Sequence, residues 1–325
     1  MGKFSFAVAV PAAALAGLFA TGVDALDISV AVANPPDDPA SVALMRMKEQ
    51  LDNGETGLSL TVYTSGQLGG EADLVEQVRL GALDMTTVAA SVISTFSPTM
   101  GVLDIPYLLS LENDQVWRVL DGPIGEQIGA QMEEDTGMRL VAYWSAGERS
   151  VFTRDRLINS PEDLAGLRIR VIPSPVYLDT FNALGAEAVG MPYAEVYTSL
   201  ATGAIDGAEQ DTSGFRVMKF YEQAAYYSFT KHILLIRPLV MNPAVLDEMT
   251  PEQRAEFDAA IADATEFQRQ YILDMVADNM TYLAEQGVQF AEPDLAAFRE
   301  LAAPVREDYA KTLGADLIAA IEAIE

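Results

Sequence analysis

The chain has 325 residues, of which 48 are acidic, 20 are Lys or Arg, one is histidine and none is cysteine. The lack of cysteine excludes disulfides, iron–sulfur clusters and cysteine nucleophiles, and the single histidine, His232, excludes a multi-histidine zinc site. The net charge of −28 argues against nucleic acid and anionic membrane surfaces as partners, so we expect any anion site to be local.

The amino terminus has the pattern of a secretory signal peptide over residues 1–25. Lys3 precedes an apolar stretch over 4–20, and Val23 and Ala25 lie at the −3 and −1 positions of a cleavage site. A membrane anchor is the alternative, but the apolar stretch is short for a span of about 20 residues. We therefore expect export to the periplasm, cleavage, and no stable membrane insertion of the mature chain.

Two successive parts of the chain alternate strands and helices, which is typical of α/β domains with largely parallel sheets. In the first part, we predict strands over 27–34, 58–64, 84–89 and 138–145, and helices over 38–51, 69–80, 114–120 and 123–136. The second part starts near Gly147, with strands over 167–172 and 204–208 and helices over 175–184 and 193–202.

A long helix follows these two parts. Thr250 and Gln253 have the spacing of a capping box, and neither glycine nor proline interrupts the helical pattern between Pro251 and Gln286. At about 1.5 Å per residue such a helix is ~50 Å long, which suits a brace across two lobes. The predicted division is residues 26–146 plus about 236–275 for lobe I, and 147–235 plus about 276–325 for lobe II.

The motifs of the common enzyme classes are absent: there is no Walker loop, G-x-G-x-x-G, G-x-S-x-G or H-E-x-x-H. Nucleophile–base pairs are nearly unavailable with one histidine and no cysteine. A pair of carboxylates, as in a glycosidase, stays open because 48 acids make chance pairs common. We predict a protein that is not an enzyme and needs neither cofactor nor metal, with a secreted enzyme acting on sugar acids as the competing class.

Two arginines, Arg168 and Arg170, lie in one predicted strand. Arginine is costly in a covered parallel sheet, but is acceptable at the carboxyl end of a strand, where α/β proteins bind ligands. There a guanidinium can hold a carboxylate through two parallel hydrogen bonds. The alternative is a structural salt bridge, and spacing alone does not choose between the two arginines because they share one face.

At these residues the sequence resembles a known family, the solute-binding component of TRAP transporters (DctP family). The resemblance covers essentially the whole mature chain, and its order and spacing are specific although each motif is short. Within the family, the sequence is most similar to members that bind uronates and related sugar acids. The matching segments are 65–70 (SGQLGG), 83–85 (LDM), 105–108 (IPYL), 147–149 (GER), 164–171 (LAGLRIRV), 184–186 (LGA), 191–197 (MPYAEVY) and 203–209 (GAIDGAE).

The resemblance implies a two-lobed α/β binding-protein fold with a central cleft that closes on an organic acid. It also implies that Arg170 holds the ligand carboxylate and that Arg149 is a second arginine of the site. Further ligand-binding positions implied by the family are Tyr193, Gln210, Asn34 and Ser91.

Four more residues are candidates for the site. Glu209 is expected to orient an arginine or to accept from sugar hydroxyls, and Asp211 to accept from hydroxyls. Trp144 and Tyr177 either stack on a sugar ring or fill the core. His232 is expected to be a structural histidine.

The sequence departs from the sugar-acid members at two points. Gln210 and Asp211 replace two asparagines, and Ile236-Arg237-Pro238 lies where those members tend to carry Pro-Glu. The ligand class therefore keeps alternatives, namely a C4-dicarboxylate or a 2-oxo or 2-hydroxy acid. The implied partners are the small and large membrane subunits of a TRAP transporter, with a signalling receptor as the alternative.

Overall fold

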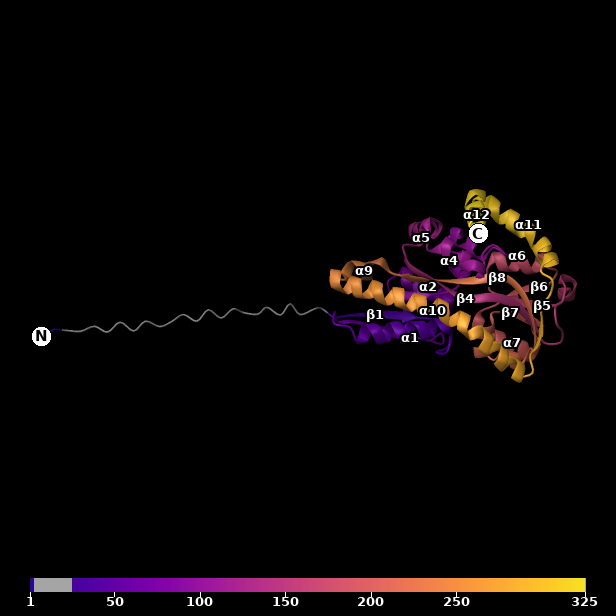
Figure 1. Cartoon of the computed structure of the whole chain (residues 1–325), viewed down its shortest axis with the longest axis horizontal. Helices are drawn as coiled ribbons and strands as arrows, with labels where there is room; N and C mark the ends of the chain where they lie inside the picture. The colour runs from indigo at the N-terminus through magenta and orange to yellow at the C-terminus, as the bar shows by residue number, and fades with distance from the viewer. Residues whose placement is uncertain (3–24, 325) are drawn as a thin grey trace.

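One mixed sheet of nine strands lies at the centre of the molecule, with helices above and below it (Figure 1). This computed structural model describes residues 1–2 and 25–324, so the predicted signal peptide lies almost entirely outside the described residues. The strand order is β2-β1-β3-β8-β4-β7-β5-β6, with β9 added beside β8. Within the described part of the chain, no helix is both long enough and apolar enough to span a bilayer.

The first part of the chain forms three parallel strands joined by helices. Asp38 starts α1 by accepting a hydrogen bond from the backbone N–H of Ala40, with Pro39 at the first helical position. The elements are β1 (Leu26–Ala31), α1 (Pro39–Asp52), β2 (Leu58–Tyr63), α2 (Glu71–Arg79), β3 (Met85–Thr87), α3 (Ala90–Ile93), the 3₁₀ helices η1 (Pro98–Asp104) and η2 (Glu112–Asp114), α4 (Gln115–Leu120) and α5 (Pro123–Thr136). β1 pairs in parallel with β2 and β3, as the predicted alternation requires.

The second part repeats this arrangement at the other end of the sheet, where β5 pairs in parallel with β6 and β7. Its elements are η3 (Pro161–Leu164), β5 (Arg168–Val171), α6 (Pro175–Ala183), β6 (Glu187–Gly190), η4 (Tyr193–Glu195), α7 (Val196–Thr202), β7 (Gly207–Gln210), α8 (Thr212–Val217) and η5 (Phe220–Glu222). Both predicted helices of this part are present, and the last strand begins three residues later than predicted.

Two long antiparallel strands, β4 (Arg139–Thr153) and β8 (Tyr226–Met241), run through both parts and join them into one sheet. The expected parallel pairing holds within each part, in the β1–β2, β1–β3, β5–β6 and β5–β7 pairs, but the β3–β8, β4–β8 and β4–β7 pairs are antiparallel. The pairing shifts register between Ser145 and Gly147, where Gly147 takes a φ of +101° that favours glycine. This irregularity lies beside residue 145, where the strand was predicted to end.

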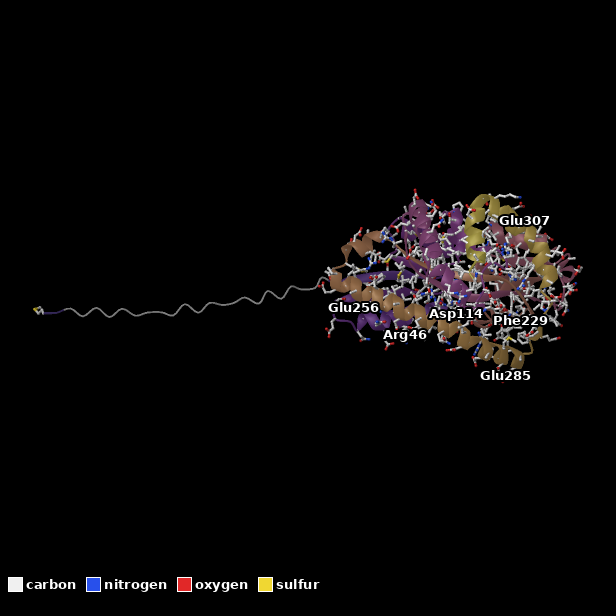
Figure 2. The ribbon with its side chains drawn as sticks, turned by 45° about the horizontal axis from the view of Figure 1, so that its top comes forward. Arg46, Asp114, Phe229, Glu256, Glu285 and Glu307 are labelled. Atoms are coloured by element: carbon white, nitrogen blue, oxygen red, sulfur yellow. The ribbon has the colours of Figure 1, made fainter. Side chains whose placement is uncertain are left out.

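The helix α10 (Pro251–Glu285) spans the molecule, as predicted from its uninterrupted pattern. It contacts α1 and β4 on one side and α8 on the other, and its two ends are marked by Glu256 and Glu285 in Figure 2. The remaining elements are α9 (Pro243–Glu248), β9 (Gln289–Ala291), α11 (Ala296–Leu313) and α12 (Ala315–Glu322). Because α11 packs on α6 while α12 packs on α5, the carboxyl terminus touches both parts, and the predicted lobe boundaries stay a prediction.

Candidate functional site

The two arginines of β5 have different environments. Arg168, at the start of the strand, is partly exposed and pairs with Asp206, whose Oδ1 lies 2.7 Å from its Nη2. Arg170, near the end of the strand, is only 3% exposed and forms no ion pair with any residue that the structure describes. Tertiary structure thus separates two residues that the spacing left equivalent.

The guanidinium of Arg170 is held by one edge only. Its Nε and Nη2 donate to the backbone oxygen of Met191 at 2.9 and 2.7 Å, and its cation lies 5.9 Å from the centre of the Tyr193 ring. Burial lowers the pKa of Arg170 to about 10, and the Glu209 carboxylate opposes that shift, so the side chain is still cationic at neutral pH. The Nη1–Nη2 edge is left for an acceptor, and a carboxylate matches it in geometry and charge.

Arg149, the second predicted arginine, is instead paired within the protein. Its Nε donates to Oε2 of Glu209 and its Nη2 donates to the backbone oxygen of Glu209 at 2.6 Å, all of it buried. His232 lies behind this pair, with Nε2 at 3.5 Å from Glu209 and Nδ1 at 2.9 Å from the Thr230 hydroxyl. Burial raises the pKa of Glu209, but Arg149 and His232 outweigh it and hold that pKa below its usual value.

Tyr193 connects Arg170 to Gln210, because its ring lies beside the Arg170 cation and its hydroxyl bonds to the Gln210 amide. The amide nitrogen of Gln210 donates to the Tyr193 hydroxyl at 2.9 Å, while the amide oxygen of Gln210 is buried without a hydrogen-bond partner in the described residues. We call Arg170, Tyr193 and Gln210 the β5 group. Asp211, the next residue, caps α8 by accepting from the backbone N–H of Gly214 at 2.8 Å, and burial raises its pKa to about 6.

A second polar group, which we call the β8 group, consists of Arg237, Asn34, Asp38 and Glu71. Arg237 is 4% exposed, and its Nη2 donates to Asn34 at 2.8 Å and to Glu71 at 3.0 Å. The amide nitrogen of Asn34 in turn donates to Asp38 at 2.8 Å. The predicted residue Asn34 is therefore held in one orientation between a cation and a carboxyl group.

The β5 and β8 groups act on each other electrostatically. Burial raises the pKa of Tyr193, and Asp38 raises it further. Glu71 likewise acts to raise the pKa of Arg170. The two groups are therefore close enough in space for Asp38 to act on Tyr193 and for Glu71 to act on Arg170, although the groups are far apart in the sequence.

The other predicted residues, Trp144, Tyr177 and Ser91, do not belong to the β5 or the β8 group. Trp144 is fully buried in the core beside α1, and its indole nitrogen donates to Thr265 of α10 at 2.9 Å, so it fills the core rather than joining either polar group. Tyr177 is fully buried with its ring 5.9 Å from the Arg149 cation. Ser91, at the start of α3, is fully buried, and its hydroxyl has no hydrogen-bond partner in the described residues.

The prediction missed most of the β8 group. Arg237 interrupts an apolar stretch of β8, and a lone charge in a buried strand was a signal for a polar site. Glu71 directly follows the matched segment 65–70, at the start of α2. Asp104, at the end of η1, was also missed: it is fully buried, burial raises its pKa well above the usual value, and Arg149 opposes the shift. Over residues 1–2 and 25–324, no cluster of acidic or histidine side chains suits a metal ion.

Known proteins resemble this chain over nearly its full length. The profile of the DctP family, described as bacterial extracellular solute-binding protein, family 7, matches residues 30–312. The 2,3-diketo-L-gulonate-binding periplasmic protein YiaO of Escherichia coli (strain K12) is 30% identical over 293 residues, which is 89% of each chain.

Solved structures agree with this match. A TRAP periplasmic solute-binding protein from Sulfitobacter sp. NAS-14.1 with bound β-D-galacturonate has a TM-score of 0.87 at 29% identity, covering 92% of this chain and all of its own. Another from Pseudomonas putida F1, with bound D-glucuronate, has a TM-score of 0.87 at 30% identity, covering 92% of this chain and 98% of its own. The chain belongs to the DctP family and is a solute-binding protein of the TRAP type with the two-lobed fold of that family.

Proposed function

We propose that this protein is exported to the periplasm, binds one molecule of a sugar acid between the β5 and β8 groups, and delivers it to TRAP membrane subunits without changing it. The observation that carries the proposal is Arg170, a buried cation with no acidic partner among the described residues. Burying a charge without a counter-charge is costly, and a ligand carboxylate would supply the counter-charge that Arg170 lacks.

The balance of charge supports a ligand with a single carboxylate. Three buried arginines lie in or beside the two polar groups. Arg149 is paired with Glu209 and Arg237 with Glu71, so Arg170 is the one of these three that has no ion pair among the described residues. A C4-dicarboxylate would bring a second negative charge towards Asp38 and Glu71, which is unfavourable. Sugar hydroxyls, in contrast, can donate to these carboxyl oxygens.

The names of the relatives point to the same chemical class. The two structures carry galacturonate and glucuronate, and the Escherichia coli protein is named for 2,3-diketo-L-gulonate. All three ligands combine one carboxylate with several neutral oxygens. The same combination suits one uncompensated arginine facing a group rich in carboxyl and amide oxygens.

Binding by closure follows from the way the two groups are connected. The β5 group comes from β5, η4 and the end of β7, whereas the β8 group comes from β8, the start of α2 and the segment between β1 and α1. The long strands β4 and β8 and the helix α10 connect the two parts of the molecule. A ligand that contacts both groups at once stabilises the closed arrangement, because each open half makes only part of the contacts. A transporter can then recognise a surface that exists only in the closed, loaded form.

The test is a ligand screen on the purified mature protein. Thermal-shift measurements and calorimetry against uronates, aldonates, C4-dicarboxylates and 2-oxo acids should show tight binding, at micromolar Kd or below, only for sugar acids. The ligand recovered after binding should be chemically unchanged, which separates a binding protein from an enzyme. Preferential binding of a C4-dicarboxylate, or conversion of the sugar acid, would contradict the proposal.

A further inference from the structure

Arg237 uses its hydrogen-bond donors unevenly. Nη2 alone serves three acceptors, namely Asn34, Glu71 and the backbone oxygen of Thr87 at 3.0 Å. Nε is buried and has no hydrogen-bond partner in the part of the chain that the structure describes, and no contact there occupies Nη1. Nε is enclosed by the protein, whereas Nη1 is not fully buried, so Nη1 is the N–H group of Arg237 that is left for a further acceptor.

The positive charge of Arg237 is balanced by an acidic neighbour, although its N–H donors are not all used. Glu71 lies 3.0 Å away, and its side chain is 18% exposed while that of Arg237 is 5% exposed. The Asp38 carboxyl lies in the same group, where burial raises its pKa and Arg237 opposes the shift. Arg237 therefore offers free N–H groups but no uncompensated charge, which is the reverse of the situation at Arg170.

We infer that Arg237 is a specificity-determining residue whose Nη1 N–H groups donate to an uncharged oxygen, a hydroxyl or ring oxygen, of the bound acid at the end remote from Arg170. This inference rests on the proposed function and deepens it. Arg170 binds the carboxylate, and Arg237 reads the neutral oxygens at the far end of the ligand. A ligand with a second carboxylate is disfavoured there because it would face Glu71 and Asp38.

The neighbours of Arg237 keep its free edge in one orientation. Asn34 is held by Arg237 on its oxygen and by Asp38 on its nitrogen, and the second oxygen of Glu71 accepts from the backbone N–H of Ala89 at 3.4 Å. A donor fixed in this way discriminates strongly, because a ligand without the matching oxygen leaves the donor unpaired. The expected penalty for such a ligand is at least tenfold in affinity.

The test combines changes in the ligand with changes in the protein. The probes are D-glucuronate and D-gluconate, each with its monodeoxy analogues, and the dicarboxylic acid D-glucarate, all measured by calorimetry. For the unmodified protein we expect one monodeoxy analogue to bind at least tenfold more weakly than its parent. In Arg237→Met that difference should fall below threefold, while the effects of the other deoxy positions stay unchanged.

Two further variants keep the test decisive. Arg237→Lys retains the charge beside Glu71 but loses the planar N–H edge, so it should fold and still lose the same discrimination if Arg237→Met is too unstable to measure. Glu71→Gln leaves Arg237 uncompensated and should shift the affinity ratio of D-glucarate to D-glucuronate at least tenfold in favour of D-glucarate.

The outcomes distinguish this inference from the proposed function. If the unmodified protein binds neither D-glucuronate nor D-gluconate nor any other sugar acid, the proposed function is wrong and this inference with it. If the unmodified protein binds a sugar acid, but the Arg237 variants keep the full discrimination against every deoxy analogue, only the inference about Arg237 is wrong. Tighter binding of D-glucarate than of D-glucuronate by the unmodified protein would also overturn it.

Discussion

The β5 and β8 groups both contain a buried arginine, yet the two arginines are in opposite electrostatic states. Among the residues that the structure describes, Arg170 donates only to the backbone oxygen of Met191, whereas Arg237 has the Glu71 carboxylate 3.0 Å away. Their burial is nearly the same, at 3% and 4% exposed. Burial alone therefore does not distinguish an arginine that has a counter-charge from one that lacks it, and the position of the nearest carboxylate does.

Arg149 is a third buried arginine, and unlike Arg170 it forms an ion pair within the protein, with Glu209. Burial lowers its pKa, but Glu209 outweighs that effect and the pKa is raised overall. The fold thus places one compensated cation beside one uncompensated cation. Variants that remove either charge or its partner should separate loss of binding from loss of stability.

The largest expected effect is on ligand affinity in Arg170→Met, which removes the charge but keeps a long apolar side chain. Loss of a buried charged contact costs about 3–5 kcal/mol, or at least hundredfold in Kd, measured by calorimetry with D-glucuronate. Arg168→Met, on the same strand, is the matched control because Arg168 is partly exposed and pairs with Asp206. Equal affinity of the two variants would show that Arg170 is not the carboxylate anchor.

The next effect is on stability in Glu209→Gln, which leaves the Arg149 charge buried without its partner. We expect the free energy of unfolding to fall by about 2–4 kcal/mol, measured by urea denaturation at neutral pH. Because the folded-state pKa of Glu209 is lowered, its contribution is present above its unfolded pKa and is lost as pH falls through the folded pKa. The cost of the substitution should therefore shrink in acid.

Glu148→Gln is the control for that prediction. Glu148 lies on β4 next to Arg149, is 30% exposed and pairs with Lys231 at 3.4 Å, so its loss should cost no more than about 1 kcal/mol. A similar loss of stability in both variants would mean that the buried pair has no special role.

The smallest effect is a gain of stability in Asp211→Asn, since asparagine can cap α8 as aspartate does. The folded-state pKa of Asp211 is raised to about 6, so ionisation penalises the folded state increasingly between about pH 4 and 6 and fully above that. We expect the variant to gain about 1–3 kcal/mol at pH 7.5 and almost nothing at pH 4.5, measured by urea denaturation. A gain of the same size at both pH values would contradict this account.

The local elements of the fold were predictable because their signals are local. The helix α10 followed from the capping box at Thr250 and an uninterrupted helical pattern, and it is present at Pro251–Glu285. The strand β4 was predicted only as far as residue 145, and β8 was not predicted. The pair Glu148-Arg149 interrupts the apolar pattern of β4, and only tertiary contacts, Lys231 for Glu148 and Glu209 for Arg149, explain why the strand continues.

The candidate site was predictable only in part. The resemblance on 164–171 indicated an arginine at the end of β5. It did not predict the ion pairs between Arg149 and Glu209 and between Arg237 and Glu71. Those pairs join residues 60 and 166 positions apart in the chain, so no short pattern reveals them. Trp144 shows the converse: an aromatic residue that suits a sugar site in the sequence fills the core beside α10.

By itself, the sequence determined the α/β alternation, the long helix and the family, because hydrophobic periodicity, capping and short motifs are properties of neighbouring residues. The tertiary structure decided that the sheet is single and mixed, and it decided which buried arginine has no acidic partner among the described residues. The physical reason is that a charge is compensated through space. Arg168 and Arg170 are indistinguishable by spacing, and they differ because Asp206 pairs with Arg168 while no acid of residues 25–324 pairs with Arg170.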